Sequence, residues 1–263
     1  MNTAGEILRE LHDRLPPHDA AVLRAGPGTA EVPATRITDP AWLAEQIRLR
    51  SLMWKSEDQR VLATLWWYSA STILVTPALA GLVVTGSALS PALEDTVLHH
   101  APSSRLTGSH STAVLGPDLE QLGSALGTAF AAVISALSAF TNGCERPLWA
   151  IATDAIANRL LWAGQAVGQV REATDLARPI IAAAGPRLPQ PRYIDVTAGP
   201  DDEFGVGTGA GTVATRRFVH RASCCLLYRI PDEGMCTSCP GRAPTERAEL
   251  LRFITARSTA SGG

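Results

Sequence analysis

Four cysteines near the end of the sequence are the residues whose types and spacing most clearly indicate chemistry. They are Cys224, Cys225, Cys236 and Cys239, and their spacing is C-C-x10-C-x2-C. Four thiolates suit either a Zn²⁺ ion or an iron–sulphur cluster. The two residues between Cys236 and Cys239 allow a tight turn to direct both thiolates at one centre. We therefore predict that these four side chains form a metal site.

The adjacent pair bears on which metal the site would hold. A Cys₄ zinc site usually takes two cysteines, separated by two to four residues, from each arm. Neighbouring side chains of an extended chain point in opposite directions, so Cys224 and Cys225 reach a single ion only if the backbone is distorted. A two-iron cluster is wider, and its ligands need not converge on one point. The spacing favours iron–sulphur but leaves zinc, disulfides and free thiols open.

Arginines outnumber acids around the cysteines. Between residues 213 and 242 the only acids are Asp232 and Glu233. An oxidised [2Fe–2S] centre with four thiolates has a formal charge of about −2, which nearby cations would offset. The cations could also attract an anionic ligand or an acidic electron-donor protein, or they could simply keep the segment hydrated. The candidates for substrate or partner contact are Arg216, Arg217, Arg221, Arg229 and Arg242.

Residues 217–240 resemble the C-terminal signature of the FhuF-like ferric siderophore reductases. The likeness rests on the cysteine spacing, on an arginine shortly before the pair and on Tyr228–Arg229 just after it. It covers a small part of the chain, and the helical region before it is similar to the family only in general character. The resemblance implies reduction of ferric siderophores, notably hydroxamates, in the bacterial cytoplasm. It also implies a [2Fe–2S] cluster whose ligands are Cys224, Cys225, Cys236 and Cys239.

This chemistry suits release of iron from a siderophore. Reduction of Fe³⁺ to Fe²⁺ lowers the charge and weakens the bonds to hard, anionic oxygen donors. Clusters with cysteine ligands reach potentials several hundred millivolts below zero. We expect no catalytic side chain beyond the ligands of the cluster.

The electrons are expected to come from another protein. Gly205-x-Gly207-x-x-Ala210 formally matches a dinucleotide fingerprint, but we expect no helix of useful length after it. The acidic residue expected about 20 residues further on is also missing. A ferredoxin or an NAD(P)H-dependent reductase is therefore the expected donor.

Two other classes of function remain as alternatives. An iron–sulphur redox sensor would need a basic nucleic-acid surface or a recognition helix, and the net charge of −2 indicates neither. We therefore expect no nucleic-acid partner. A zinc-stabilised binding module without redox activity is the other alternative.

Composition indicates a folded protein. Among 263 residues, 46% are hydrophobic and 18% are charged, which is enough to form a core. Residues 1–14 are charged throughout and lack the apolar run of a secretory signal. We therefore expect a cytoplasmic protein, in which cysteines stay reduced, and we expect it to be a monomer.

Hydrophobic periodicity and capping residues predict several helices. Asp39 before Pro40 is typical of a helix start, and Ser56 with Gln59 is typical of a capping box for the next helix. Asn142–Gly143 is expected to end a helix. The predicted helices cover residues 5–15, 40–54, 118–142, 147–170 and 174–184, and residues 16–33 read as loop.

The longest uncharged run lies between Arg60 and Glu94. Its length is sufficient for a membrane span, but it contains hydroxyl side chains, Pro77 interrupts it, and no cluster of basic residues flanks it. We therefore predict a buried core helix that breaks near Pro77, and we expect no transmembrane segment.

The rest of the chain gives an α+β fold that is predominantly α-helical. Residues 96–114 suit strand or loop, residues 192–196 a short strand, and residues 199–211 a glycine-rich connection. We predict a mainly helical siderophore-reductase-like domain over residues 1–199 with a few strands. A small cysteine-rich, [2Fe–2S]-binding module follows over residues 200–263.

A cleft between these two parts is the expected substrate site. Direct electron transfer needs the substrate close to the cluster. Five aromatic residues could line the cleft, although core packing is the alternative: Trp66, Trp67, Tyr68, Trp149 and Trp162.

We do not expect the cysteine and histidines outside the four-cysteine motif to take part in a metal site. Cys144 lies outside the motif, and we expect an incidental thiol. His99, His100 and His110 could suggest a metal site but are expected at the surface, because no matched carboxylate or cysteine pattern accompanies them. A hydrogen bond from His220 to the cluster is conceivable, but we do not expect it.

Overall fold

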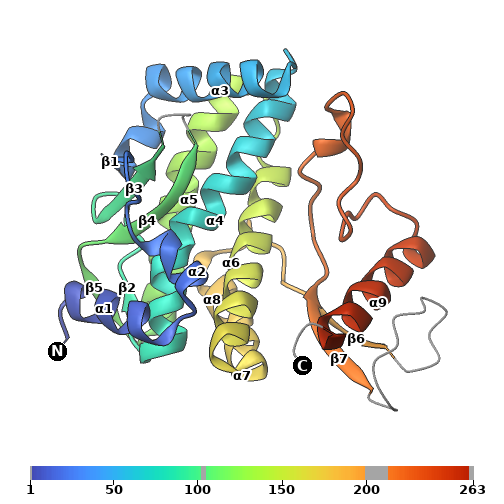
Figure 1. The fold of residues 1–263 in the computed structure, drawn as a ribbon. Coiled ribbons are helices and arrows are strands. Elements are labelled where there is room, and N and C mark those ends of the chain that lie inside the picture. The colour runs from blue at the N-terminus through green and yellow to red at the C-terminus, as the bar shows by residue number, and fades with distance from the viewer. Residues whose placement is uncertain (1, 102–104, 199–212, 261–263) are drawn as a thin grey trace.

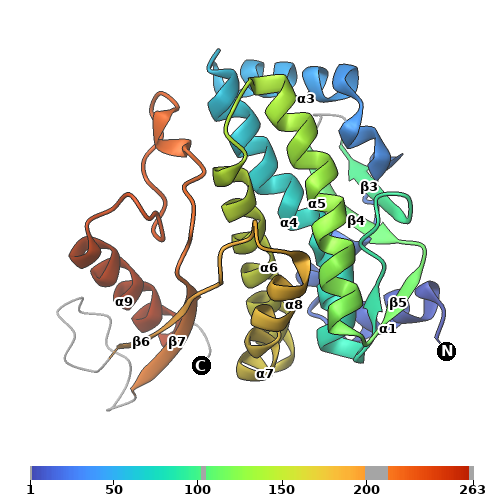
Figure 2. The ribbon, with the colours of Figure 1, turned by 180° about the vertical axis from the view of Figure 1, so that it is seen from behind.

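The computed structural model describes residues 2–101, 105–198 and 213–260. Helices dominate and a few short strands accompany them, which confirms the α+β prediction. Figures 1 and 2 show a bundle of long helices with small β-sheets on one side and the cysteine-bearing segment on the other.

Three long helices form the centre of the molecule. They are α4 (Gln59–Thr85), α5 (Leu119–Thr141) and α6 (Arg146–Val167). Trp66 and Trp67 of α4 are fully buried among them. Helix α8 (Ala177–Ala184) packs closely on α5, because Gly123 and Gly127 let its backbone approach. The rigid centre of the protein is therefore a helical core.

The capping residues placed most helix ends correctly. Asp39 caps α3 (Pro40–Trp54), Asp118 caps α5, and Asn142 ends α5 in a left-handed conformation, as predicted. Helix α1 (Ala4–Arg14) also lies where expected. The Ser56–Gln59 capping box was wrong. Helix α4 begins at Gln59, and the Asp58 carboxylate accepts the Val61 N–H at 3.1 Å.

Helix α4 does not break at Pro77, so this prediction was also wrong. Proline lacks an N–H, and the carbonyl of Ile73 therefore loses its partner within the helix. The hydroxyl of Ser109 donates to that carbonyl at 2.7 Å. A side chain from a neighbouring strand thus satisfies the freed acceptor, and the helix continues to Thr85.

Ser109→Ala should therefore destabilise the fold. The variant leaves a half-buried carbonyl without this partner, and we expect the free energy of unfolding to fall by about 1 kcal/mol. Urea unfolding followed by circular dichroism measures this change. Ser124→Ala, at an exposed position of α5, is the control. Equal stabilities of the two variants would contradict this account of α4.

The small sheets lie beside α4. Strands β1 (Ala30–Pro33), β3 (Thr96–His100) and β4 (Leu106–Ser111) form one antiparallel sheet, and β2 (Ala88–Leu89) pairs with β5 (Val114–Gly116). Residues 16–33 are not all loop, because they include α2 (Pro17–Ala20), the 3₁₀ turn η1 (Ala21–Leu23) and β1. A second 3₁₀ turn, η2 (Ala34–Thr38), leads into α3.

The last third of the chain packs against α6. After α7 (Val170–Asp175) and α8, strands β6 (Tyr193–Ala198) and β7 (Ala214–Val219) form a hairpin. The cysteine segment follows, with a 3₁₀ turn η3 (Leu227–Arg229), and α9 (Pro244–Ala260) comes last. The predicted connection at 199–211 lies outside the described residues. The domain boundary near residue 200 stays a prediction, and the strands on its two sides pair with each other.

Two helices, α4 and α5, are long and apolar enough to cross a membrane by length and composition alone. Of the most apolar stretch of α4, 67% is buried inside the protein, and the corresponding share for α5 is 44%. Burial in a protein core accounts for the composition of α4, because a helix that is apolar all round needs apolar surroundings.

Candidate metal centre

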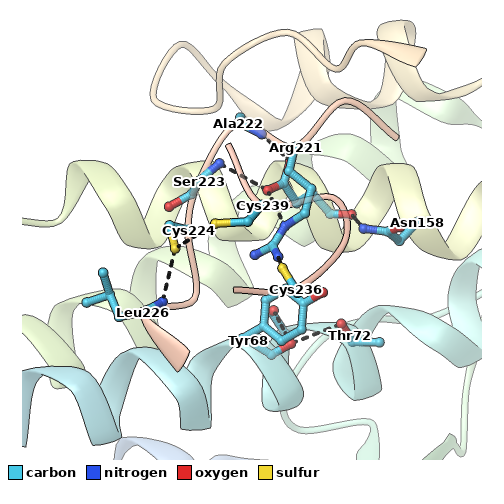
Figure 3. Close-up of polar contacts among 12 residues, drawn as sticks. Tyr68, Thr72, Asn158, Arg221, Ala222, Ser223, Cys224, Leu226, Cys236 and Cys239 are labelled. Carbon is cyan, nitrogen blue, oxygen red and sulfur yellow. Dashed lines mark hydrogen bonds and ion pairs between the residues drawn. The ribbon is translucent and has the colours of Figure 1, made fainter. Parts of the chain in front are cut away.

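Cys224, Cys236 and Cys239 lie together in the loops between β7 and α9 (Figure 3), and Cys225 directly follows Cys224 in the same loop. Cys225 and Cys239 are buried, and Cys224 and Cys236 are half-buried. The loops pack against α4 and α6, so the helical core forms one wall of the site. Sequence spacing therefore identified side chains that the fold does bring together.

The thiols fall into two pairs. The sulphur atoms of Cys224 and Cys239 lie 3.6 Å apart, and the thiol of Cys236 is the neighbour with the largest effect on the pKa of Cys225. Two thiolates bound to one tetrahedral metal ion at 2.3 Å would lie about 3.8 Å apart. The spacing of the first pair is therefore close to that of two ligands on one ion.

A turn directly after the adjacent cysteines explains how both can face the site. Leu226 has a left-handed backbone with φ of 64°, which is uncommon for a leucine. Its N–H donates to the sulphur of Cys224 at 3.3 Å. The chain therefore turns directly after the adjacent cysteines, and the turn brings a backbone N–H onto the sulphur of Cys224.

Arg221 is the cation closest to the sulphurs. It is only 5% exposed, and its guanidinium donates to the sulphur of Cys236 at 3.1 Å. The same group lies 4.6 Å from the centre of the Tyr68 ring. Burial lowers the pKa of Arg221, but negative partners outweigh it and raise the pKa overall. Arg221 therefore remains protonated and favours negative charge on the sulphurs.

Asp154 of α6 fixes the segment that carries Arg221. Its carboxylate accepts the N–H groups of Ala222 and Ser223 at 2.8 and 3.1 Å, and it lies 3.7 Å from the guanidinium of Arg221. Burial raises the pKa of Asp154 to about 6, against the effect of these hydrogen bonds. Sequence reasoning missed Asp154. The available signal was a single acid within an apolar helix.

Two further arginines near the cysteines already have partners. Arg242 donates to the carbonyl of Cys236 at 3.0 Å and forms an ion pair with Glu246. Arg229 lies 3.3 Å from the carboxylate of Asp58 at the start of α4. These two arginines, predicted as possible substrate contacts, hold the loops in place in this structure.

The metal-free thiols differ in acidity. The hydrogen bond with Cys236 lowers the pKa of Cys225 to about 5, and burial raises the pKa of Cys224 to about 11. One thiolate thus forms easily beside Arg221. Four sulphurs in one place, with a guanidinium and a backbone N–H donating to them, suit a soft metal ion or an iron–sulphur cluster.

A cleft of about 520 Å³ lies beside the cysteine loops. Tyr68, Arg159 and Trp162 form its helical wall, and Arg216 and Ser238 line the other side. Ser238 stands between the ligand candidates Cys236 and Cys239, so the cleft reaches the cysteine loop. The volume is within the usual range for small-molecule sites.

The two hairpin arginines differ in their surroundings. Both Arg216 and Arg217 line the cleft. Arg217 makes two hydrogen bonds of 2.8 Å to the carboxylate of Asp195 and one of 2.7 Å to Thr174. Arg216 lies over the ring of Phe218, at 5.3 Å from its centre. Arg217 therefore has a structural role in the hairpin as well as a place in the cleft wall.

The predicted aromatic lining is correct only in part. Tyr68 and Trp162 line the cleft. Trp66, Trp67 and Trp149 are buried in the core, so for these three the alternative of core packing holds. Periodicity alone could not separate the two groups, since all five lie on helices.

The structure also shows the surroundings of three other residues considered in the sequence analysis: Cys144, His220 and His99. Cys144 is exposed, and it lines a pocket of about 200 Å³ together with Cys224. His220 contacts Arg192 at 3.0 Å. His99 is fully buried, so the prediction of a surface histidine was wrong.

Comparison with known families agrees with this geometry. Residues 221–240 match the family model described as the FhuF 2Fe-2S C-terminal domain. The matched segment begins at Arg221 and includes all four cysteines. No curated protein matches the chain.

Proposed function

Because the C-terminal segment of the chain belongs to the FhuF 2Fe-2S C-terminal domain family and so binds a [2Fe–2S] cluster, we propose that the protein is a ferric siderophore reductase. It would reduce siderophore-bound Fe³⁺ to Fe²⁺ by one-electron transfer. The observation that carries this proposal is a small-molecule cleft whose wall includes Ser238 of the cysteine loop.

The ligands of the cluster are Cys224, Cys225, Cys236 and Cys239. These four residues would hold the cluster, and the sulphurs of Cys224 and Cys239 already lie 3.6 Å apart. When bound, the cluster supplies single electrons at low potential. Arg221 donates a charged hydrogen bond to one ligand sulphur and so favours the more negative, reduced state.

The cleft is the proposed binding site of the ferric siderophore. The N–H groups of Arg159 and Arg216 can donate to the oxygen atoms that surround the iron. Tyr68 and Trp162 offer apolar surface to the organic part of a hydroxamate siderophore. The ring of Tyr68 touches both the cleft and Arg221, which keeps the route from substrate to sulphur short.

The same chemistry leads to a proposed electron donor, oligomeric state and cellular location. Electrons would come from a ferredoxin or an NAD(P)H-dependent reductase. The glycine-rich segment Gly205-x-Gly207-x-x-Ala210 lies outside the described residues. The protein acts as a monomer in the cytoplasm, where reduced thiols persist and iron is taken up for use.

Anaerobic single-turnover mixing tests this function. Reduced protein is mixed with ferric hydroxamate, catecholate and carboxylate siderophores in the presence of an Fe²⁺ trap. The proposal predicts trapped Fe²⁺ and reoxidised protein with the hydroxamates. No Fe²⁺ with any of them would contradict it.

Arg216→Ala tests the cleft. The variant removes hydrogen-bond donors from the cleft wall without touching a cysteine, so we expect the KM for the siderophore to rise about threefold to tenfold, or roughly 1 kcal/mol. The visible spectrum should not change. Arg48→Ala, whose exposed guanidinium binds Glu45 on α3, is the control. An unchanged KM in the Arg216 variant would place the substrate elsewhere.

A further inference from the structure

A second group of metal-binding side chains lies on the other side of the molecule. The β1–β3–β4 sheet and the cysteine segment stand on opposite sides of the long helices (Figure 1). On this sheet, Glu31, His99 and His110 bring one ligand atom each to within 4.8 Å of one another. The cluster proposed above cannot use these residues.

The register of the sheet explains why the three side chains share one face. Glu31 of β1 is the direct partner of His99 on β3, and paired residues of an antiparallel sheet point the same way. His99 also pairs with Gly108 of β4, and His110 lies two residues beyond that glycine. Side chains two residues apart share a face, so each strand contributes one candidate ligand.

The opposite face of the sheet packs on the helical core. Leu98 is buried, and its partner Ser109 donates to Ile73 of α4. The face with the histidines is covered by η1, because Gly108 leaves room for the backbone of Val22. His99 is therefore enclosed between the sheet and the N-terminal segment, and Glu31 and His110 lie at the rim.

The distances suit ligands of one ion. The Nε2 atom of His99 lies 2.9 Å from Nδ1 of His110, and that nitrogen lies 4.0 Å from Oε1 of Glu31. Two atoms bound to one ion at about 2.0–2.2 Å can be no more than about 4.4 Å apart. Glu31 is 56% exposed and can rotate to shorten the remaining distance.

Packing alone does not account for His99. Its ring is fully buried, yet Nδ1 has no hydrogen-bond partner among the described residues. The nitrogen that faces His110 and would bind an ion is Nε2, which already contacts Nδ1 of His110. The unsatisfied Nδ1 shows that hydrogen bonds do not fully account for the burial of this ring.

We propose that Glu31, His99 and His110 bind a divalent transition-metal ion of the kind that imidazole prefers, such as Zn²⁺ or Fe²⁺. Two histidines and one carboxylate are a common set for these ions and leave coordination positions open. His110 is 23% exposed, so an ion can enter from the rim.

Titration of the cluster-loaded protein with Zn²⁺ under anaerobic conditions tests the site. Calorimetry should show one Zn²⁺ per chain, and X-ray absorption should show bonds near 2.0–2.1 Å to nitrogen and oxygen without the 2.3 Å bonds of thiolates. His110→Ala should weaken binding roughly 100-fold, and Glu31→Gln roughly tenfold. His100→Gln is the control, since His100 instead contacts Gln46 at 3.2 Å.

The variants separate folding from binding. Glu31 is exposed, so Glu31→Gln should fold normally even if His110→Ala does not. Zn²⁺ should also raise the Tm of the wild type and of His100→Gln, but raise that of Glu31→Gln less. Absence of stoichiometric Zn²⁺ in the wild type, sulphur ligation, or equal binding by Glu31→Gln would overturn the proposal.

Discussion

Cys236→Ser should abolish reduction of ferric siderophore and remove most of the visible absorption of the protein. Cys236 is a proposed cluster ligand, and it also receives the hydrogen bond from Arg221. Serine is a harder ligand and does not bind the cluster as thiolate does. We expect at least a 100-fold loss of single-turnover rate, the upper end of the effect of altering groups around a metal site. Iron and sulphide analysis of the anaerobically purified variant measures the loss of the cluster.

Cys144→Ser is the matched control for this variant. Cys144 is exposed and lies outside the motif, although it shares a pocket with Cys224. Its replacement should leave the iron content and the rate within a factor of two of the wild type. Full activity and iron content in Cys236→Ser, or equal losses in both variants, would refute the ligand assignment.

Arg221→Met should make the reduction potential of the cluster more negative. The variant removes a buried cation and its hydrogen bond to sulphur, both of which favour the reduced state. A hydrogen bond to a charged group contributes about 1.5–3 kcal/mol, which corresponds to about 60–130 mV for one electron. A redox titration followed by electron spin resonance measures the shift.

Loss of Arg221 also leaves Asp154 buried without its cation. The double variant Arg221→Met/Asp154→Asn removes this unpaired charge and should show the same direction of shift if the single variant is unstable. Arg221→Lys keeps the charge and should shift the potential less. Arg229→Met is the matched control, because Arg229 binds Asp58 and contacts no cysteine sulphur among the described residues. A potential within about 10 mV of the wild type in Arg221→Met would contradict the tuning role.

The cysteine site could be predicted because its ligands are close in sequence. All four lie within residues 224–239, and thiolate chemistry follows from residue type and spacing. Asp154 could not be found in this way. It lies on a different helix and contacts Ala222 and Ser223 only after the chain has folded. Sequence thus identified the cysteines that the fold brings together, but not the carboxylate that positions the segment before them.

The difference between local and distant contacts also explains which fold predictions were correct and which were wrong. Asp39 and Asp118 cap helices through their own neighbouring N–H groups, so their role is visible in sequence. The continuation of α4 through Pro77 depends on Ser109, which lies on a separate strand. Helix α9 was missed, although Pro244 at its start and Glu246 in its first turn are typical helix signals.

Burial was the property that sequence predicted least well for polar residues. His99 lies in a polar stretch and was expected at the surface, but η1 covers its face of the sheet. Arg221 was predicted either to offset the charge of the cluster or to meet a substrate or partner, and it lies buried against a sulphur. In both cases the element that covers the side chain is distant from it in sequence, so composition and periodicity do not predict the burial.

Electron spin resonance of rapidly frozen mixtures tests the central claim most directly. Fully reduced protein is mixed anaerobically with one equivalent of ferric hydroxamate siderophore, and samples are frozen at increasing times. The account predicts that the signal of the reduced cluster and that of siderophore Fe³⁺ disappear together, one for one. A cluster signal that persists while the siderophore stays ferric would contradict it.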